Sequence, residues 1–116
     1  MIELMLTTEV LADQTCVVGV EGDLDLYTVP ELERRLMAVT GTDVDRVVVD
    51  LTECTFLDST ALGVLIAFNR GPDSKPRLCL VATDRNVLKV FAITGLDRFF
   101  DIAPSRLSAL GAAASV

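Results

Sequence analysis

Hydrophobic residues follow a strand pattern at the start of the chain. The stretches IELML (residues 2–6) and TCVVGVEG (residues 15–22) are largely apolar, and the second is rich in β-branched side chains. Asp13 and Gln14 lie between them. Apolar runs bounded by polar turn residues are typical of paired strands. The pattern therefore predicts a β-hairpin at the start of the fold.

The pattern becomes helical after the acidic stretch at residues 22–27. Apolar residues then recur at helical spacing, at Leu32, Leu36 and Val39. Pro30 suits a first helical turn, and Thr28 stands three residues before Glu31, as in a capping box. We predict an acidic loop that leads directly into a helix capped by Thr28.

Strands and helices alternate through the rest of the chain. RVVVDL (residues 46–51) is an unbroken apolar run, typical of a central parallel strand covered on both faces. We then expect a helix from Ser59 to about Asn69, a turn at 71–76, a strand at 77–82, a helix capped by Asp84 that ends near Gly95, a strand at 98–102 and a helix at 104–114. The order β-β-α-β-α-β-α-β-α predicts an α/β fold, with helices packed on a mixed, mainly parallel sheet.

Length and composition fit one domain that spans residues 1–116. Of the 116 residues, 51% are hydrophobic, and a chain of this length buries about two thirds of its unfolded surface. No apolar run reaches the roughly 18 residues of a membrane-spanning helix. The first ten residues include Glu3 and no basic leader. These features predict a cytoplasmic protein that has no membrane partner.

Charge and residue types exclude several function classes. The formal net charge is −7 and His is absent, which argues against nucleic acid as a partner, because its phosphates attract basic surfaces. Without His, the chain lacks Ser-His-Asp and Cys-His nucleophiles and His-containing zinc sites. Cys16, Cys54 and Cys79 are far apart and form no CxxC pair, so we expect buried, reduced thiols. No phosphate-binding glycine loop occurs, and the sequence predicts no enzyme activity, metal or cofactor.

A polar triplet, Asp58-Ser59-Thr60, stands at the start of an otherwise apolar helix. Asp58 or Ser59 could cap that helix, which is worth about 1 kcal/mol. Free N–H groups at a helix N-terminus would also suit a regulatory phosphate on Ser59. Thr60 is β-branched and one step deeper, so we expect it to be less accessible. Gly63, inside the helix, favours close packing against the sheet over contact with a partner.

Three segments in register resemble the anti-sigma factor antagonists of the STAS domain family. GDLDLYTVPEL (residues 22–32) is similar to the family's Gly-Glu-Leu-Asp loop, and VVVDLTECTFLDSTALGVLIAF (residues 47–68) resembles its Asp-Ser-Ser/Thr-Gly-Leu-Gly signature. LVATDRNVLKVFAITGLDRFF (residues 80–100) resembles its Phe-x-x-x-Gly-Leu segment. Together the segments cover nearly the whole chain.

The resemblance implies a phosphorylation switch. An unphosphorylated antagonist would bind an anti-sigma factor that is a serine kinase, and would thereby free the sigma factor. Phosphorylation of Ser59 would block this binding, and a serine phosphatase would reverse it. The docking face implied by the resemblance consists of Asp23, Asp25, Thr28, Asp58, Ser59, Thr60, Leu62 and Gly63. The chain departs from the family at Ala61, where Gly is frequent, and at Leu26-Tyr27, where polar residues are common.

Other interpretations remain open, as does the oligomeric state. Some STAS proteins are non-phosphorylated scaffolds, such as stressosome parts, or lipid-transport accessories. A two-component receiver would use Asp50 as phosphoacceptor, but the acidic pair and the lysine that it needs are missing at the expected places. A Mg²⁺-dependent phosphoryl-transfer enzyme would use Asp23, Asp25 and Asp58. Loop aspartates are more often capping or solvated residues.

Overall fold

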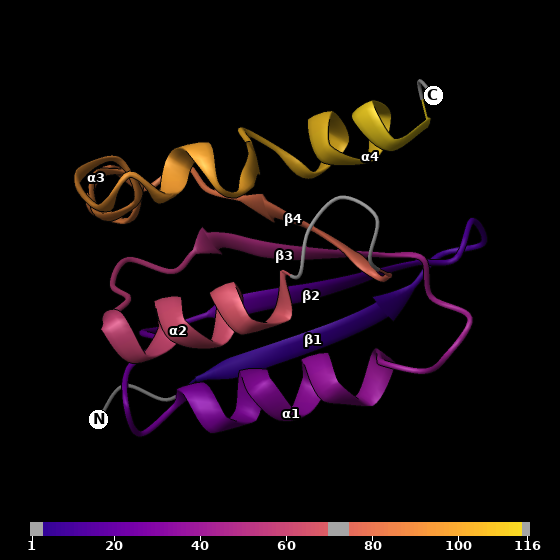
Figure 1. The fold of residues 1–116 in the computed structure, drawn as a ribbon, viewed down its shortest axis with the longest axis horizontal. Coiled ribbons are helices and arrows are strands. Elements are labelled where there is room, and N and C mark those ends of the chain that lie inside the picture. The colour runs from indigo at the N-terminus through magenta and orange to yellow at the C-terminus, as the bar shows by residue number, and fades with distance from the viewer. Residues whose placement is uncertain (1–3, 70–74, 115–116) are drawn as a thin grey trace.

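The computed structural model describes residues 4–69 and 75–114, and its elements follow the predicted order (Figure 1). These elements are β1 (Met5–Val10), β2 (Thr15–Glu21), α1 (Val29–Val39), β3 (Arg46–Glu53), α2 (Ser59–Phe68), β4 (Arg77–Val81), α3 (Arg85–Thr94), the short 3₁₀ helix η1 (Leu96–Arg98), β5 (Asp101–Ala103) and α4 (Arg106–Ala114). The α/β prediction is confirmed. Residues 2 and 3 of the predicted hairpin and most of the predicted turn at 71–76 lie outside the described residues.

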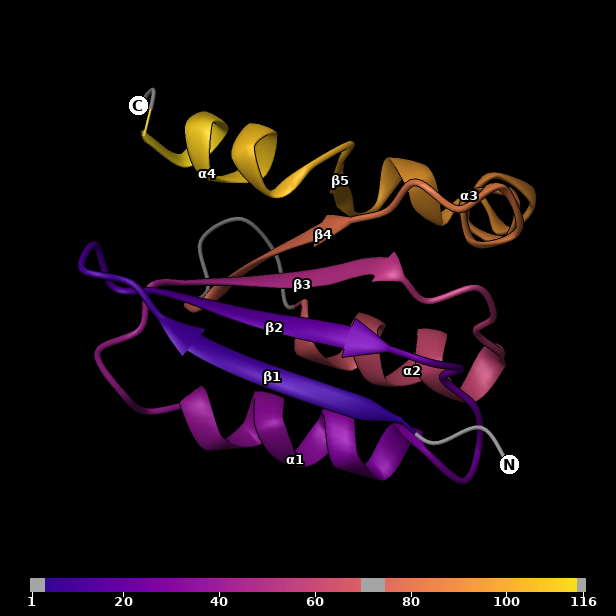
Figure 2. The ribbon, with the colours of Figure 1, turned by 180° about the vertical axis from the view of Figure 1, so that it is seen from behind.

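The five strands form one sheet in the order β1-β2-β3-β4-β5. The β1–β2 hairpin is antiparallel, and each following pair is parallel. Gln14 makes the hairpin turn with a positive φ of 64°. Figure 2 shows β1 at one edge of the sheet and β5 beside β4 at the other. The predicted mixed, mainly parallel sheet is therefore confirmed.

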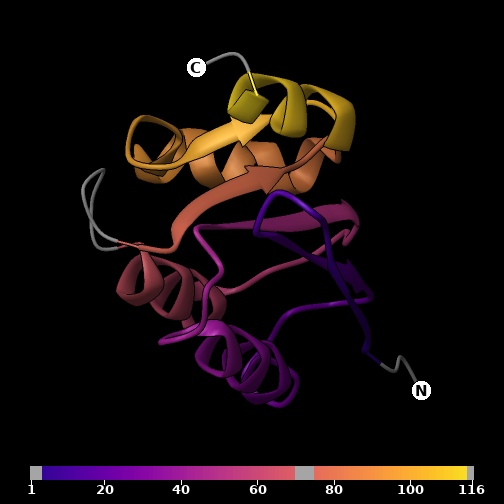
Figure 3. The same ribbon diagram turned by 90° about the vertical axis from the view of Figure 1, so that its right-hand side faces the viewer.

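The strands bury both faces because their side chains alternate between two cores. Val47 and Val49 of β3 belong to the larger core, which the helices α1 and α2 cover, and Val48 belongs to a smaller core with Ala109 of α4. Figure 3 shows α1 and α2 on one side of the sheet and α4 on the other. This double coverage explains the unbroken apolar run of β3.

The end of the chain differs from the prediction at one point. Asp84 caps α3 and Gly95 ends it in the left-handed conformation, as expected. The strand predicted at 98–102 is wrong at its start, because β5 begins only at Asp101. The chain instead turns through η1 and buries Phe100 edge-on against Phe91, with the ring centroids 5.7 Å apart. Phe100 therefore fills the core instead of extending the sheet, whereas Phe99 stays exposed.

An ion pair between a buried carboxylate and a partly exposed arginine joins the central strand to α4. Asp50 of β3 accepts hydrogen bonds from the Arg106 Nε at 2.5 Å and from the Thr52 N–H at 2.9 Å. Gly19 leaves room for the arginine over the sheet, because a side chain there would place its Cβ only 2.9 Å from the Arg106 Nη2. Burial raises the pKa of Asp50, but the hydrogen bonds from Thr52 and Arg106 outweigh this effect and hold that pKa below its usual value.

The three cysteines and the helices bear on two further expectations from the sequence. Cys16, Cys54 and Cys79 are all free thiols; the first two are buried and Cys79 is half-buried. Within the described residues, no helix combines the length and apolarity needed to cross a membrane.

We predict that Arg106→Gln lowers the unfolding free energy by about 1–2 kcal/mol at pH 7, because it leaves a buried carboxylate short of a donor. This expected loss of unfolding free energy is kept small because the Arg106 side chain is 42% exposed and water screens the ion pair. The pKa of Asp50 is lowered in the folded state. The pair therefore contributes its full stabilisation to the unfolding free energy above the usual pKa of about 4, and this stabilisation is lost as the pH falls below that value. Chemical denaturation at pH 7 and pH 3 should show the difference shrinking at the lower pH. An equal loss of unfolding free energy at pH 7 and pH 3 would contradict this role. The control is Arg98→Gln, which changes an exposed arginine.

Candidate functional site

Two loops meet where β2 and β3 end, and they are joined through their backbones. The Leu24 N–H donates to the Phe56 carbonyl at 2.9 Å, and the Asp58 N–H donates to the Leu24 carbonyl at 3.1 Å. These bonds form a single parallel bridge between Leu24 and Leu57, whose side chains are buried. The loop at 22–28 and the loop at 54–58 are thus one unit in front of α2.

The Asp58 carboxylate fixes both this unit and the start of α2. Its Oδ1 accepts from the N–H groups of Thr60 at 3.0 Å and Ala61 at 3.1 Å, and its Oδ2 accepts from the Leu26 N–H at 3.2 Å. The sequence left open whether Asp58 or Ser59 caps the helix, and the structure assigns the cap to Asp58. One carboxylate therefore caps α2 and holds the acidic loop.

Asp25 and Thr28 shape the acidic loop from within. The Thr28 Oγ1 donates to the Asp23 carbonyl at 2.7 Å and accepts from the Asp25 N–H at 2.9 Å. The Asp25 Oδ1 accepts from the N–H groups of Tyr27 and Thr28. The three docking residues predicted in this loop are therefore close together, and two of them act as turn-forming groups.

The capping box predicted at α1 is wrong. Thr28 stands at the N-cap position, but its side chain makes no capping hydrogen bond, because its hydroxyl is engaged with the loop behind it. Glu31 instead forms an ion pair with Arg34. The hydroxyl thus organises the loop. At the start of α1, the N–H groups of Thr28 and Val29 donate to the Asp25 carbonyl instead.

Ser59 lies at the surface without a structural bond. Its residue is exposed, and within the described residues its hydroxyl has no hydrogen-bond partner. Thr60 is only half-buried but less exposed than Ser59, as predicted, whereas Leu62 is 8% exposed and packs into the core beneath the helix. Leu62 can therefore support the predicted docking face but offers it little surface.

The close packing predicted for Gly63 is wrong. The residue is exposed, and a Cβ built on it would meet no atom within 4 Å. Gly63 follows Ser59 by four residues and Ile66 follows by seven, so all three line the exposed face of α2. This arrangement leaves the other interpretation of Gly63, contact with a partner, as the open one.

An apolar rim near Asp58 was missed among the predicted site residues. We define it as Leu26, Tyr27 and Phe56, whose exposed fractions are 60%, 88% and 50%. Leu26 is bonded through its N–H to Asp58, and Phe56 precedes that residue by two positions. Large apolar side chains in solvent, grouped together, mark interaction surfaces. The departure from the family at Leu26-Tyr27 was the signal in the sequence.

The aspartates do not form a metal site in the part of the chain that the structure describes. No group of three or more His, Cys, Asp and Glu residues within those ranges is placed to hold a metal ion. The carboxylates of Asp25 and Asp58 accept backbone hydrogen bonds, and Asp50 is paired with Arg106 on the other side of the sheet. These contacts give the magnesium-enzyme and receiver interpretations no support.

Comparisons with known proteins identify the family and the fold of the chain. A family model described as Mlab, STAS domain, matches residues 7–107. An anti-sigma-B factor antagonist of Staphylococcus epidermidis is 34% identical over 80 residues, which are 68% of this chain and 74% of the relative. The crystal structure of an anti-sigma factor antagonist from Mycobacterium paratuberculosis superimposes with a TM-score of 0.85 at 30% identity, covering 95% of this chain and 93% of the other.

A more distant solved structure shares the fold. The anti-sigma factor antagonist SpoIIAA in its unphosphorylated form superimposes with a TM-score of 0.79 at 21% identity, over 97% of this chain and 98% of that one. The same arrangement of sheet and helices is therefore kept at low sequence identity.

We predict that Asp58→Ala destabilises the fold more than Asp84→Ala. Asp84 makes a matched cap on α3, where its carboxylate also accepts from two N–H groups. Each substitution should lose a cap worth about 1 kcal/mol, and Asp58→Ala should also lose the bond to Leu26. Ser59→Ala should change the unfolding free energy by less than about 0.5 kcal/mol. Chemical denaturation measures all three, and a Ser59→Ala loss equal to that of Asp58→Ala would contradict the assignment.

Proposed function

Since the chain belongs to the STAS domain family, and within it to the anti-sigma factor antagonists, we propose that it binds an anti-sigma factor that is a serine kinase. In the unphosphorylated state it captures this partner and releases the sigma factor. Phosphorylation of Ser59 ends the binding, and a serine phosphatase restores it. The protein acts as a single domain over residues 1–116, in the cytoplasm.

The observation that carries this proposal is the freedom of Ser59. Its hydroxyl is exposed and is not used to cap α2, because Asp58 supplies that cap. A kinase could therefore modify it without breaking a structural hydrogen bond. A serine that capped its own helix would lose that cap on modification.

The proposed docking face combines the polar loop with the apolar rim. Asp23, Asp25, Thr28, Asp58, Ser59, Thr60 and Gly63 supply the polar and small positions around the helix start, above Leu62. Leu26, Tyr27 and Phe56 supply apolar area that a partner can bury. Aromatic anchors ringed by polar groups are typical of protein interfaces. This combination favours a protein partner over a small polar substrate.

Phosphate at residue 59 would disturb this face through charge. The sequence suggested that free amides at the helix start would bind the phosphate. The N–H groups of Thr60 and Ala61 instead already donate to Asp58 and are not free for it. The added charge of about −1.5 to −2 would stand beside the Asp58 carboxylate and the apolar rim. A docked partner would have to desolvate it, which is costly without a matching cation. The switch thus acts on binding while the fold stays intact.

Our first functional prediction concerns the phosphate acceptor and its variants. Incubation of the chain with the partner kinase and ATP should add one phosphate at Ser59 and none at Thr60, as mapped by mass spectrometry. Ser59→Ala should bind the purified anti-sigma factor constitutively. Ser59→Asp should bind about ten-fold more weakly, a difference of about 1.4 kcal/mol, because it places an unpaired carboxylate in the interface. Circular dichroism should show both variants folded.

Two results would argue against this switch. Equal affinity of the wild type, Ser59→Ala and Ser59→Asp would mean that residue 59 lies outside the interface. Tight binding together with no phosphate at Ser59 would favour a scaffold or accessory role without a switch. A phosphate found on another residue would overturn the assignment of the acceptor.

The second functional prediction concerns the apolar rim. Tyr27→Ala and Phe56→Ala should each weaken binding about ten-fold, because interface aromatic residues commonly contribute more than 1 kcal/mol. Their exposure means that stability should hardly change. Ile93→Ala on α3 is a matched control, since Ile93 is 73% exposed and is not part of the rim. A titration in which Ile93→Ala matters as much as Tyr27→Ala would contradict the rim's role.

A further inference from the structure

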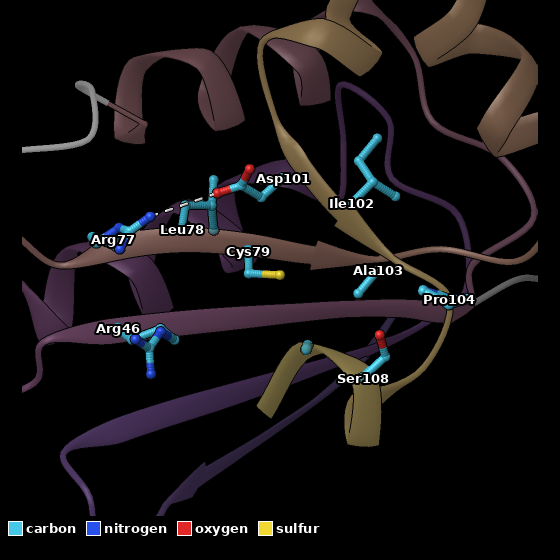
Figure 4. Close-up of a pocket in the computed structure, with 10 residues that line it drawn as sticks. Arg46, Arg77, Leu78, Cys79, Asp101, Ile102, Ala103, Pro104 and Ser108 are labelled. Atoms are coloured by element: carbon cyan, nitrogen blue, oxygen red, sulfur yellow. Dashed lines mark ion pairs between the residues drawn. The ribbon is translucent and has the colours of Figure 1, made fainter. Parts of the chain in front are cut away.

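A cavity of about 370 Å³ lies between α4, β5 and the first residues of β3 and β4 (Figure 4). Its lining includes Arg46, Arg77, Cys79, Ala103, Ser108 and Ala109. Arg46 and Arg77 open their strands, whereas the loops around Ser59 follow the end of β3. The cavity is therefore on the α4 face and toward the other end of the sheet from the docking face.

Two arginines form one end of this cavity. Arg46 and Arg77 are direct neighbours in the parallel register of β3 and β4. Like charges placed opposite each other on a sheet are unfavourable, and the chain as a whole carries a net charge of −7. A cationic pair in an acidic protein is thus a local feature that a bound anion would stabilise.

The guanidinium groups keep hydrogen-bond donors available. Arg77 is 3.9 Å from the Asp101 carboxylate, which is too long for a hydrogen bond, and both side chains are at least half exposed. Figure 4 shows this contact as the ion pair drawn in the cavity. Arg46 forms no ion pair with any residue in the ranges 4–69 and 75–114. Planar guanidinium groups with free donors are suited to carboxylate and phosphate heads.

Apart from the Asp101 carboxylate, the rest of the cavity is apolar or neutral. Cys79 lies between the arginines and Ala103 in Figure 4, and Ala109 comes from α4. Burial raises the pKa of the Cys79 thiol, and the Asp101 carboxylate adds to this, against the opposite effects of Arg46 and Arg77. The thiol is therefore neutral at pH 7 and does not oppose an anion. Ser108 adds a hydroxyl at the side of α4.

We propose that this cavity binds a small organic anion that has an apolar body. The carboxylate or phosphate head lies against Arg46 and Arg77, and the body lies over Cys79, Ala103 and Ala109. The cavity volume is at the small end of the range for ligand pockets, about 300–1,000 Å³, which limits the body to a few carbon atoms. Such a ligand would contact both the sheet and α4, and this site is separate from the docking face.

The test is a titration of the isotope-labelled full chain, followed by the NMR shifts of its amides. The probes are hexanoate, hexyl phosphate, inorganic phosphate and 1-hexanol, each up to millimolar concentration. Hexanoate, hexyl phosphate or both should shift the amides of Arg46, Arg77, Cys79 and Ser108 in a saturable way. Saturation by only one of the two identifies the head group. If neither saturates, the proposal is wrong.

The same titration separates the contributions of charge and apolar contact. Inorganic phosphate and 1-hexanol should each bind at least ten-fold more weakly than the better alkyl anion, because each lacks one half of the ligand. Inorganic phosphate that binds as tightly as hexyl phosphate would overturn the role of the apolar floor. Hexanol that binds as tightly as either anion would overturn the role of the arginines.

Variants locate the head group. Arg46→Gln and Arg77→Gln should each weaken binding of the better alkyl anion about ten-fold, and Arg46→Lys should lose less because it keeps the charge but not the planar fork. Arg98→Gln removes an exposed arginine outside the cavity and should leave binding unchanged. Equal weakening by Arg98→Gln would mean that anions bind by general charge, which contradicts the proposal. Dispersed, native-like amide spectra confirm that each variant is folded.

Discussion

The geometry of the whole candidate site depends on one carboxylate. Asp58 accepts hydrogen bonds from the first amides of α2 and from the acidic loop, so the helix start and the loop cannot move independently. The backbone bridge between Leu24 and Leu57 holds the same two segments from below. A cap on a surface helix is worth about 1 kcal/mol, but here the same oxygens also set the relative position of two loops that are far apart in sequence.

The polar and apolar parts of the proposed docking face follow from this arrangement. Because Asp58 satisfies the helix end, the neighbouring hydroxyl is left at the surface, and because the loop is pinned at Leu26, the side chains of Leu26 and Tyr27 stay exposed beside it. The apolar rim is therefore held out in solvent by the hydrogen bonds of the loop backbone and not by packing. A surface prepared in this way loses little conformational freedom when a partner binds.

Periodicity predicted most of the fold, because the elements bury regular faces. The apolar run at residues 46–51 gave the central strand, and Asp84 with Gly95 gave both ends of α3. The failures were residues with a choice of partner. Thr28 could bond forward to the helix or back to the loop, and Phe100 could extend a strand or fill the core. Gly63 faces open space, and a glycine inside a helix looks the same in the sequence whether it faces solvent or packs closely against a neighbour. Such choices depend on segments that are distant in sequence, so the chain alone does not decide them.

The separation of the cap from the neighbouring hydroxyl has an evolutionary consequence. Residue 59 carries no structural hydrogen bond within the described residues, so selection for folding imposes little constraint on its side chain. Under the proposed switch, selection at that position can then act on regulation alone. A single nucleotide change could remove or restore the proposed modification site while the scaffold, held by its aspartate neighbour, is inherited unaltered. Paralogues that diverge at this one position could share an architecture and still respond to different signals.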